Sequence, residues 1–253
     1  MSEFLSVHRE NIDDTLDEYR PLARARRLDY QGWLDFSEQL RMRGIIDLLL
    51  HMEPDALQRD LCRSGRAFLF GVTALPRETV AASAALPLFD ALACNDRATA
   101  AQIAAALRPT FDADVEYEED FLYVRFLCAR FLLGAAAAEV EALLARAESI
   151  ADPEDPRWLV ARALAAADAS VFEPALDTLL DSYQRRLSSM AENGRLSDEA
   201  AATLPYFCSE GLALLRLAEE LGLQTFADHR LVPSVVRADL SATFATVTWQ
   251  SPP

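Results

Sequence analysis

The chain contains no lysine: all 24 of its basic residues are arginines, against 40 aspartates and glutamates, and the formal net charge is −16. Without a lysine amine, the chain cannot carry out Schiff-base chemistry or supply a Walker-type phosphate lysine or a Ser-Lys nucleophile pair. A strongly acidic protein repels nucleic acid and anionic membranes and attracts cations or basic proteins. We therefore expect neither nucleic acid nor a membrane as a partner.

Residues that commonly bind metals are also scarce. The three histidines, His8, His51 and His229, have no second ligand at helical or turn spacing, and the sequence has no C-x-x-C pair, so it gives no support to a zinc site. A G-x-S-x-G serine elbow and glycine-rich phosphate loops are absent as well. These absences favour a protein that is not an enzyme and that uses no cofactor or metal.

The cysteines and the N-terminus indicate a compartment. The four cysteines, at positions 62, 94, 128 and 208, lie far apart, and three fall within apolar helical patterns. This usage predicts buried free thiols in a reducing cytoplasm rather than disulfides. The N-terminal MSEFLSVHRENIDD is acidic and lacks the apolar core of a signal peptide, and no run of about 18 uncharged apolar residues occurs. We expect a soluble cytoplasmic protein.

Glycine is rare, with eight residues, whereas leucine and alanine dominate and β-branched runs are short. This composition predicts an all-α fold. A chain of 253 residues is long enough to bury a full core, so we expect one helical domain over 1–253, in which residues 151–156 could form a hinge. Hydrophobic periodicity predicts helices over 4–19, 29–51, 55–74, 77–93, 96–107, 118–133, 136–149, 157–168, 172–191, 198–221 and 234–240.

Short loops between these helices predict antiparallel neighbours, stacked as helical hairpins in an irregular α-solenoid or a tetratricopeptide-like bundle. ALACNDRATAAQI and ALAAADASVFEPAL share A-L-A-x-x-D before a new apolar helix, which predicts a helix end, a tight turn and a second helix in each. Two copies are too few to establish a repeat. The tail VTWQSPP is predicted to be extended and to lie against the helices through Phe244 and Trp249.

The stretch DADVEYEED, residues 112–120, is called the acidic segment below. It places six carboxylates in nine residues, directly before the apolar run FLYVRFLCARFLL. Its last three acids fit the first turn of a helix, where the helix dipole favours anions. The first three alternate with other residues, so in an extended strand they would share one face with Glu118. A solvated loop, a bound cation and a basic partner protein each explain such a row.

The closing part of the chain resembles a known family. FEPALDTLLDSYQRRL, LPYFCSEGLALLRLAEELGL and HRLVPSVV occur in this order, from residue 172 to residue 236. They resemble the end of the immunity protein 49 family of bacterial polymorphic-toxin and contact-dependent competition systems, over the last third of the chain. The resemblance implies an all-helical cytoplasmic protein that binds one cognate toxin and neutralises it by occlusion. Many toxins of these systems are nucleases with basic clefts, which an acidic surface would fit.

Two functions of different classes follow. The first is an immunity protein that binds a basic toxin through the acidic segment, with Tyr117 as an aromatic anchor among the charges. The second is a helical-repeat scaffold that binds a peptide or adaptor in an uncharged, asparagine- and aromatic-lined groove. An enzyme that holds a divalent metal on Asp112 and Asp114 is a third option. The predicted partner-binding residues are Asp112, Asp114, Glu116, Tyr117, Glu118, Glu119 and Asp120.

Overall fold

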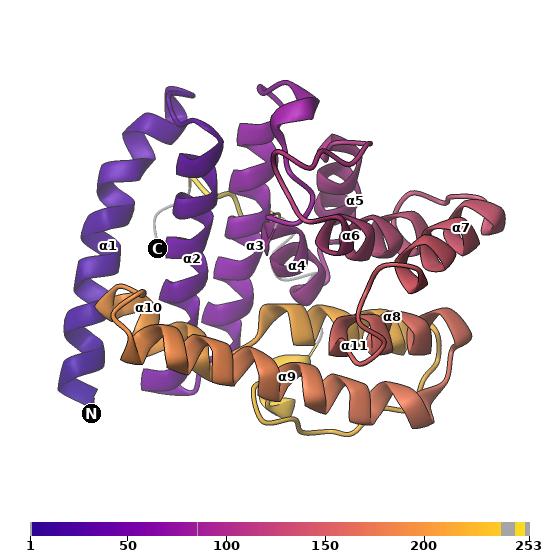
Figure 1. Ribbon diagram of the computed structural model, residues 1–253. Helices are drawn as coiled ribbons and strands as arrows, with labels where there is room; N and C mark the ends of the chain where they lie inside the picture. Colours follow the sequence, from indigo (N-terminus) through magenta and orange to yellow (C-terminus); the bar gives the residue numbers. More distant parts are fainter. Residues whose placement is uncertain (1, 85, 239–245, 251–253) are drawn as a thin grey trace.

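The computed structural model describes residues 2–84, 86–238 and 246–250 (Figure 1). The fold is all-α, as predicted, and these residues contain no β-strand. The helices are α1 (Ser2–Arg24), α2 (Tyr30–His51), α3 (Pro54–Val72), α4 (Leu86–Ala93), α5 (Arg97–Ala106), α6 (Glu118–Phe131), α7 (Ala137–Glu148), α8 (Pro156–Ala166), α9 (Ala169–Glu192), α10 (Asp198–Thr203) and α11 (Ser209–Glu220). Three short 3-10 turns are η1 (Arg77–Thr79), η2 (Leu204–Tyr206) and η3 (Ser234–Arg237).

Aspartates begin several of these helices, because a carboxylate can accept an unpaired N–H of the first turn. Asp29 accepts the Gly32 N–H at 2.8 Å in α2. The two similar stretches in the sequence form the predicted turns. In each, the helix ends at a residue with positive φ, 60° at Asn95 and 52° at Ala167, and the next aspartate caps the following helix.

The first three long helices lie side by side, with α2 between α1 and α3 (Figure 1). Helix α4 packs against α3, α5 and α11, so a late helix of the chain contacts an early one. Helix α6 packs against α7, and α8 packs against α9. Helix α9 runs beneath the first helices toward α10, which packs against α1 and α2 (Figure 1). Elements from both halves of the sequence therefore meet around α2, α4 and α11.

Buried aromatic rings and ion pairs join the first helices. Trp33, Phe36 and Phe68 are buried in the core. Between α2 and α3, Arg43 donates two hydrogen bonds to Asp60, at 2.7 and 2.5 Å, and both side chains are buried. A buried pair of this kind fixes the register of two helices, because removing one partner would leave the other charge unpaired away from water.

The described part of the tail lies against the first helices, as predicted. Trp249 is buried, and the centre of its ring lies 6.2, 5.8 and 5.2 Å from the ring centres of Trp33, Phe36 and Phe70, respectively. Phe244, the other predicted contact, and residues 239–240 of the last predicted helix lie outside the described residues. From residue 234 to 237, the chain forms a 3-10 turn rather than an α-helix.

Two further predicted helices differ in part from the structure. The prediction 77–93 contains only η1 and α4, because residues between them bond to a distant loop: the Val80 carbonyl accepts the Arg108 N–H at 3.0 Å, and the Ser83 N–H donates to Glu116 at 2.8 Å. The prediction 198–221 is divided into α10, η2 and α11. Pro205 has no backbone N–H with which to continue the hydrogen bonds of α10, and the chain resumes as an α-helix only at Ser209.

The remaining expectations concern the thiols, membranes and the hinge. All four cysteines are buried free thiols, and burial raises the pKa of Cys128 to about 12. Across the described ranges, no helix has both the length and the apolar character needed to cross a membrane. At the suggested hinge, Asp152 accepts the Glu154 N–H at 2.9 Å and Asp155 caps α8; a hinge motion there stays a prediction.

Candidate functional site

The acidic segment folds into a turn before α6 and is not extended. The Asp112 carbonyl accepts the N–H groups of Val115 and Glu116 at 3.1 and 3.2 Å, which closes a tight turn. The row of carboxylates on one face, which an extended strand would give, is therefore not formed. Each carboxylate of the segment has surroundings of its own.

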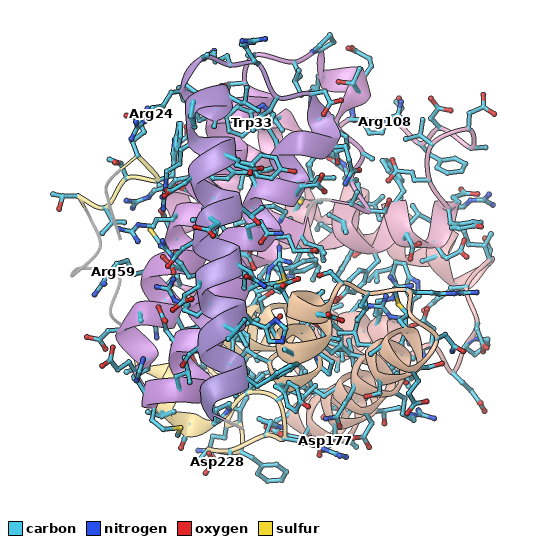
Figure 2. The ribbon with its side chains drawn as sticks, turned by 90° about the vertical axis from the view of Figure 1, so that its left-hand side faces the viewer. Arg24, Trp33, Arg59, Arg108, Asp177 and Asp228 are labelled. Atoms are coloured by element: carbon cyan, nitrogen blue, oxygen red, sulfur yellow. The ribbon has the colours of Figure 1, made fainter. Side chains whose placement is uncertain are left out.

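Two carboxylates of the segment, those of Asp112 and Glu116, lie near Arg108, which is labelled at the upper right of Figure 2. Asp112 accepts a hydrogen bond from Arg108 at 2.9 Å and one from the Asp114 N–H at 3.1 Å. The bonds from Asp114 and Arg108 hold the pKa of Asp112 below its usual value. Glu116 points inward: its side chain is 0% exposed, and it accepts the Ser83 N–H at 2.8 Å.

The carboxylates in the first turn of α6 pair with arginines of later helices. Arg146 of α7 donates to both oxygens of Glu118, at 2.7 and 2.8 Å, and these bonds lower the pKa of Glu118. Arg157 of α8 lies 2.6 Å from Asp120. Glu118 and Asp120, two of the three acids in the first turn of α6, thus connect α6 to α7 and α8.

Four further side chains of the acidic segment reach solvent at least in part, those of Asp114, Val115, Tyr117 and Glu119. Tyr117 is 74% exposed, and Val115 beside it is 52% exposed. Among the described residues, the carboxylates of Asp114 and Glu119 have no hydrogen-bonding or ion-pair partner. These outward groups, an aromatic ring with carboxylates around it, form the part of the segment that a partner protein could contact directly.

A cleft of about 1080 Å³ lies next to the acidic segment. Residues of α2, α4, α6, α8, α9 and α11 line it, together with the loops around Ser83 and Glu154. The acidic segment adjoins its rim at two points, because Glu116 bonds to Ser83 and Asp120 is itself a lining residue. The lining carboxylates are Asp35, Glu38, Asp120, Asp152, Glu154, Asp155 and Glu210, and the lining arginines are Arg41, Arg157 and Arg186.

The hydrogen bond between Tyr123 of α6 and Glu210 of α11 is a central contact of the cleft lining, with 2.8 Å between the Tyr123 hydroxyl and Oε1 of Glu210. Burial raises the pKa of Glu210 above its usual value, although the Tyr123 hydrogen bond and the arginines Arg157 and Arg186 act in the opposite direction. Burial likewise raises the pKa of Tyr123. A cation near this carboxylate would stabilise its ionised form.

The wall of the cleft contains a buried ion pair. Arg41 of α2 donates to both oxygens of Asp90 of α4, at 2.8, 3.0 and 2.9 Å, and Asp90 is 0% exposed. The Ser64 hydroxyl donates to the same carboxylate at 2.5 Å. Although burial acts to lower it, the pKa of Arg41 is raised because Asp90 stabilises its charge. Arg41 is thus neutralised inside the protein and offers little positive charge to a ligand.

Two lining carboxylates lack partners. Among the described residues, the side chains of Glu38 and Glu154 make neither a hydrogen bond nor an ion pair. Asp35, by contrast, accepts hydrogen bonds from Gln31 and from Tyr19, at 2.7 and 3.4 Å. The cleft consequently presents an excess of negative charge that its own arginines do not neutralise.

Within the described ranges, no three residues among His, Cys, Asp and Glu are grouped so that they could hold a metal ion. Asp112 and Asp114, the third option from the sequence, form a turn in which one carboxylate accepts the backbone N–H of the other residue. Tyr123 and Glu210 form a hydrogen-bonded pair, and burial raises the pKa of both.

Of the seven predicted site residues, only Asp120 lines the cleft. The sequence analysis missed Tyr123, Glu38 and Glu210, which come from three separate helices. Two weak signals exist. Tyr123 is a lone phenol in a long apolar run, and a buried tyrosine hydroxyl usually has a partner. Glu210 is a lone acid between apolar stretches. Neither signal indicates that Tyr123 and Glu210 form a hydrogen bond with each other.

The scan against protein-family models gives no match, and the searches of curated proteins and of solved structures give none either. The resemblance to the immunity protein 49 family therefore stays a prediction, and the function has to be argued from the cleft and the acidic segment.

Proposed function

We infer that this protein is a non-catalytic immunity protein, which binds a cognate basic toxin through the cleft and the outward groups of the acidic segment. The observation that supports this most directly is the excess of carboxylates over guanidinium groups in the cleft, with the acidic segment on its rim. An anionic cleft with an anionic rim attracts a basic protein from a distance and raises the rate of encounter. The toxin would be neutralised by occlusion of its own functional surface.

The exposed ring of Tyr117 supports a protein as the partner. Tyrosine is enriched among the few residues that contribute most of the energy of an interface, and it does so when the partner covers it. With its side chain 74% exposed, Tyr117 has no such cover within the chain. The neighbouring carboxylates of Asp114 and Glu119 would form the polar surroundings that such an anchor usually has.

Two finer features belong to the same proposal. An irregular solenoid of helical hairpins is consistent with the side-by-side packing of α1, α2 and α3 and with the paired helices α8 and α9. A cytoplasmic location is consistent with four buried thiols that are not joined in disulfides. Both features agree with an inhibitor that works inside the cell that produces it.

The alternative function is a helical scaffold that binds a peptide. The volume of the cleft favours it, since about 1080 Å³ could receive several residues of an extended chain. The lining contains the aromatic rings of Phe89, Tyr123 and Tyr183, but it is charged and has no asparagine, whereas that hypothesis predicted an uncharged, asparagine- and aromatic-lined groove. Gene neighbourhood separates the two functions: an adjacent gene for a large toxin supports immunity, and a neighbourhood without one supports the scaffold.

The test of the immunity function is co-expression with the toxin encoded beside this gene, with bacterial growth as the readout. We expect the wild-type protein to restore growth and to form a complex with the toxin in pull-down. Continued toxicity despite soluble expression would refute the proposal.

The contribution of the rim is tested with variants that leave the internal pairs intact. Tyr117→Ala combined with Asp114→Arg should weaken toxin binding by about 2 kcal/mol or more, because both the anchor and the local charge are lost. Glu10→Arg, on an exposed part of α1, is the matched control. Equal affinity of the rim variant and the control would remove the rim from the interface.

A further inference from the structure

The cleft has chemistry suited to one kind of side chain from the partner. We propose that the cleft binds an arginine-bearing segment of the partner protein, and that Glu38 and Glu210 are the carboxylates that pair with its guanidinium groups. The inference rests on the proposed function only in that the partner is a basic protein. It adds which residue of the partner is recognised and where.

The first support is the state of the lining carboxylates. Asp120 forms an ion pair with Arg157, and Asp155 caps α8, so both carboxylates already have partners within the protein. Glu38 makes no hydrogen bond or ion pair among the described residues, and the arginine that acts on its charge, Arg41, is already paired with Asp90. Glu210 accepts a hydrogen bond from the neutral hydroxyl of Tyr123, while Arg157 and Arg186 act on its charge without forming an ion pair with it. A cation that enters the cleft therefore finds two carboxylates whose charge is not offset by a close ion pair.

The second support is how the cleft accommodates the guanidinium groups of its own chain. Arg157 lies over the ring of Tyr123, at 5.5 Å from the ring centre, and 2.6 Å from Asp120. Arg186 lies over the ring of Tyr183, at 5.8 Å from the ring centre. Guanidinium groups stack on aromatic rings and bind carboxylates with two parallel hydrogen bonds, whereas an ammonium acts as a compact point charge. A lining of tyrosines and carboxylates therefore favours arginine over lysine.

The charge of the cleft also excludes the main rival occupants. A nucleotide or another phosphate compound would face the lining carboxylates, while the positive charge of Arg41 is already neutralised by Asp90. The volume, about 1080 Å³, exceeds what one side chain fills, so a stretch of chain fits better than a single small cation.

A peptide titration tests the inference without the toxin. The probe is a fluorescein-labelled, N-acetylated and C-amidated nonapeptide of alternating arginine and serine, with lysine-serine and glutamate-serine peptides of the same length for comparison. Binding is followed by fluorescence anisotropy at about 0.15 M salt, where long-range attraction to the acidic surface is largely screened. The proteins are wild type, the single variant Glu38→Gln and the double variant Glu38→Gln/Glu210→Gln.

The matched control is Glu10→Gln/Glu53→Gln, which removes the same charge from exposed residues of α1 and of the loop before α3. We expect saturable binding of the arginine peptide, weakened about tenfold or more by the double variant, since each lost charge removes a charge-assisted hydrogen bond. The control should bind as the wild type does. Glu38→Gln alone should show part of the loss of affinity. Because the Glu38 side chain makes no hydrogen bond or ion pair among the described residues, this variant tests the inference even if the double variant folds poorly.

Three results would overturn the inference: no saturable binding of the arginine peptide, an equal loss in the control variant, or equal affinity for the lysine peptide. An arginine peptide bound in the cleft by a protein that does not neutralise the toxin would refute the proposed function alone. A protein that neutralises the toxin but fails the peptide test would refute only this inference.

Discussion

Glu116 separates the structural carboxylates of the acidic segment from those that a partner can reach. Its side chain is fully buried, accepts the Ser83 N–H at 2.8 Å and lies 4.0 Å from Arg108. We predict that Glu116→Ala lowers the free energy of unfolding, whereas Asp114→Ala, two residues earlier and exposed, leaves it nearly unchanged. The two substitutions remove the same charge from the same segment.

The magnitude follows from the contacts. Removing Glu116 leaves the Ser83 N–H without its acceptor in a partly buried loop, at a cost of about 1–3 kcal/mol. Arg108 also loses one of its two neighbouring carboxylates, Asp112 being the other. We therefore expect a loss of about 2–4 kcal/mol for Glu116→Ala and of less than about 0.5 kcal/mol for Asp114→Ala, as for exposed positions in general.

The assay is chemical unfolding followed by circular dichroism at neutral pH, with the dependence on denaturant compared among variants to confirm that the same surface is exposed. Glu116→Gln is the informative intermediate, because its amide oxygen can still accept the Ser83 N–H while the charge beside Arg108 is lost. Its stability should fall between those of the wild type and Glu116→Ala. Equal stability of the alanine variants at positions 114 and 116 would refute the internal role of Glu116.

Three further predictions concern the core and the cleft. Asp90→Asn should destabilise the protein by about 3–5 kcal/mol in chemical unfolding, because it leaves the buried charge of Arg41 uncompensated. Adding Arg41→Met should restore part of the lost stability, and a double variant as unstable as Asp90→Asn would argue against the ion pair. Gly71→Ala should lower stability by about 1–3 kcal/mol, since a Cβ there would overlap the indole of Trp33; a melting temperature equal to wild type would contradict this. Burial raises the pKa of Glu210 above its usual 4.5, so the stabilising contribution of its protonated form is full below that pH and is lost as pH rises through the raised value. The stability of Glu210→Gln should therefore increase relative to that of the wild type as pH rises above 4.5, and a stability difference that stays constant with pH would refute the assignment.

The helices could be predicted where local signals decide them. Asp155 and the proline after it are a local signal for the start of a helix, and they stand at the start of α8. Gly222 is a local signal for the end of a helix, and it follows α11 with a positive φ. The predictions failed where distant parts of the chain decide the conformation. Val80 and Ser83 bond to residues 108 and 116, and no window of neighbouring residues contains that information.

The site was less predictable than the fold, for the same reason. A run of carboxylates is visible in any reading of residues 112–120, but the arginines that pair with Glu118 and Asp120 are 28 and 37 residues farther along the chain, at positions 146 and 157. The cleft is assembled from six helices, and the Tyr123–Glu210 bond joins residues 87 positions apart. A charge count detects the acidity of the region but not which charges remain available.

The ring cluster around Trp249 gives the protein a built-in optical reporter. Two of its three tryptophans, Trp33 and Trp249, lie 6.2 Å apart where residues 246–250 rest on the first helices, while Trp158 lies 6.0 Å from Tyr123 beside the cleft. Indole emission depends on the polarity of its surroundings, so release of the tail and filling of the cleft would alter different emitters. Replacing Trp158 by phenylalanine would leave a signal that follows the tail alone.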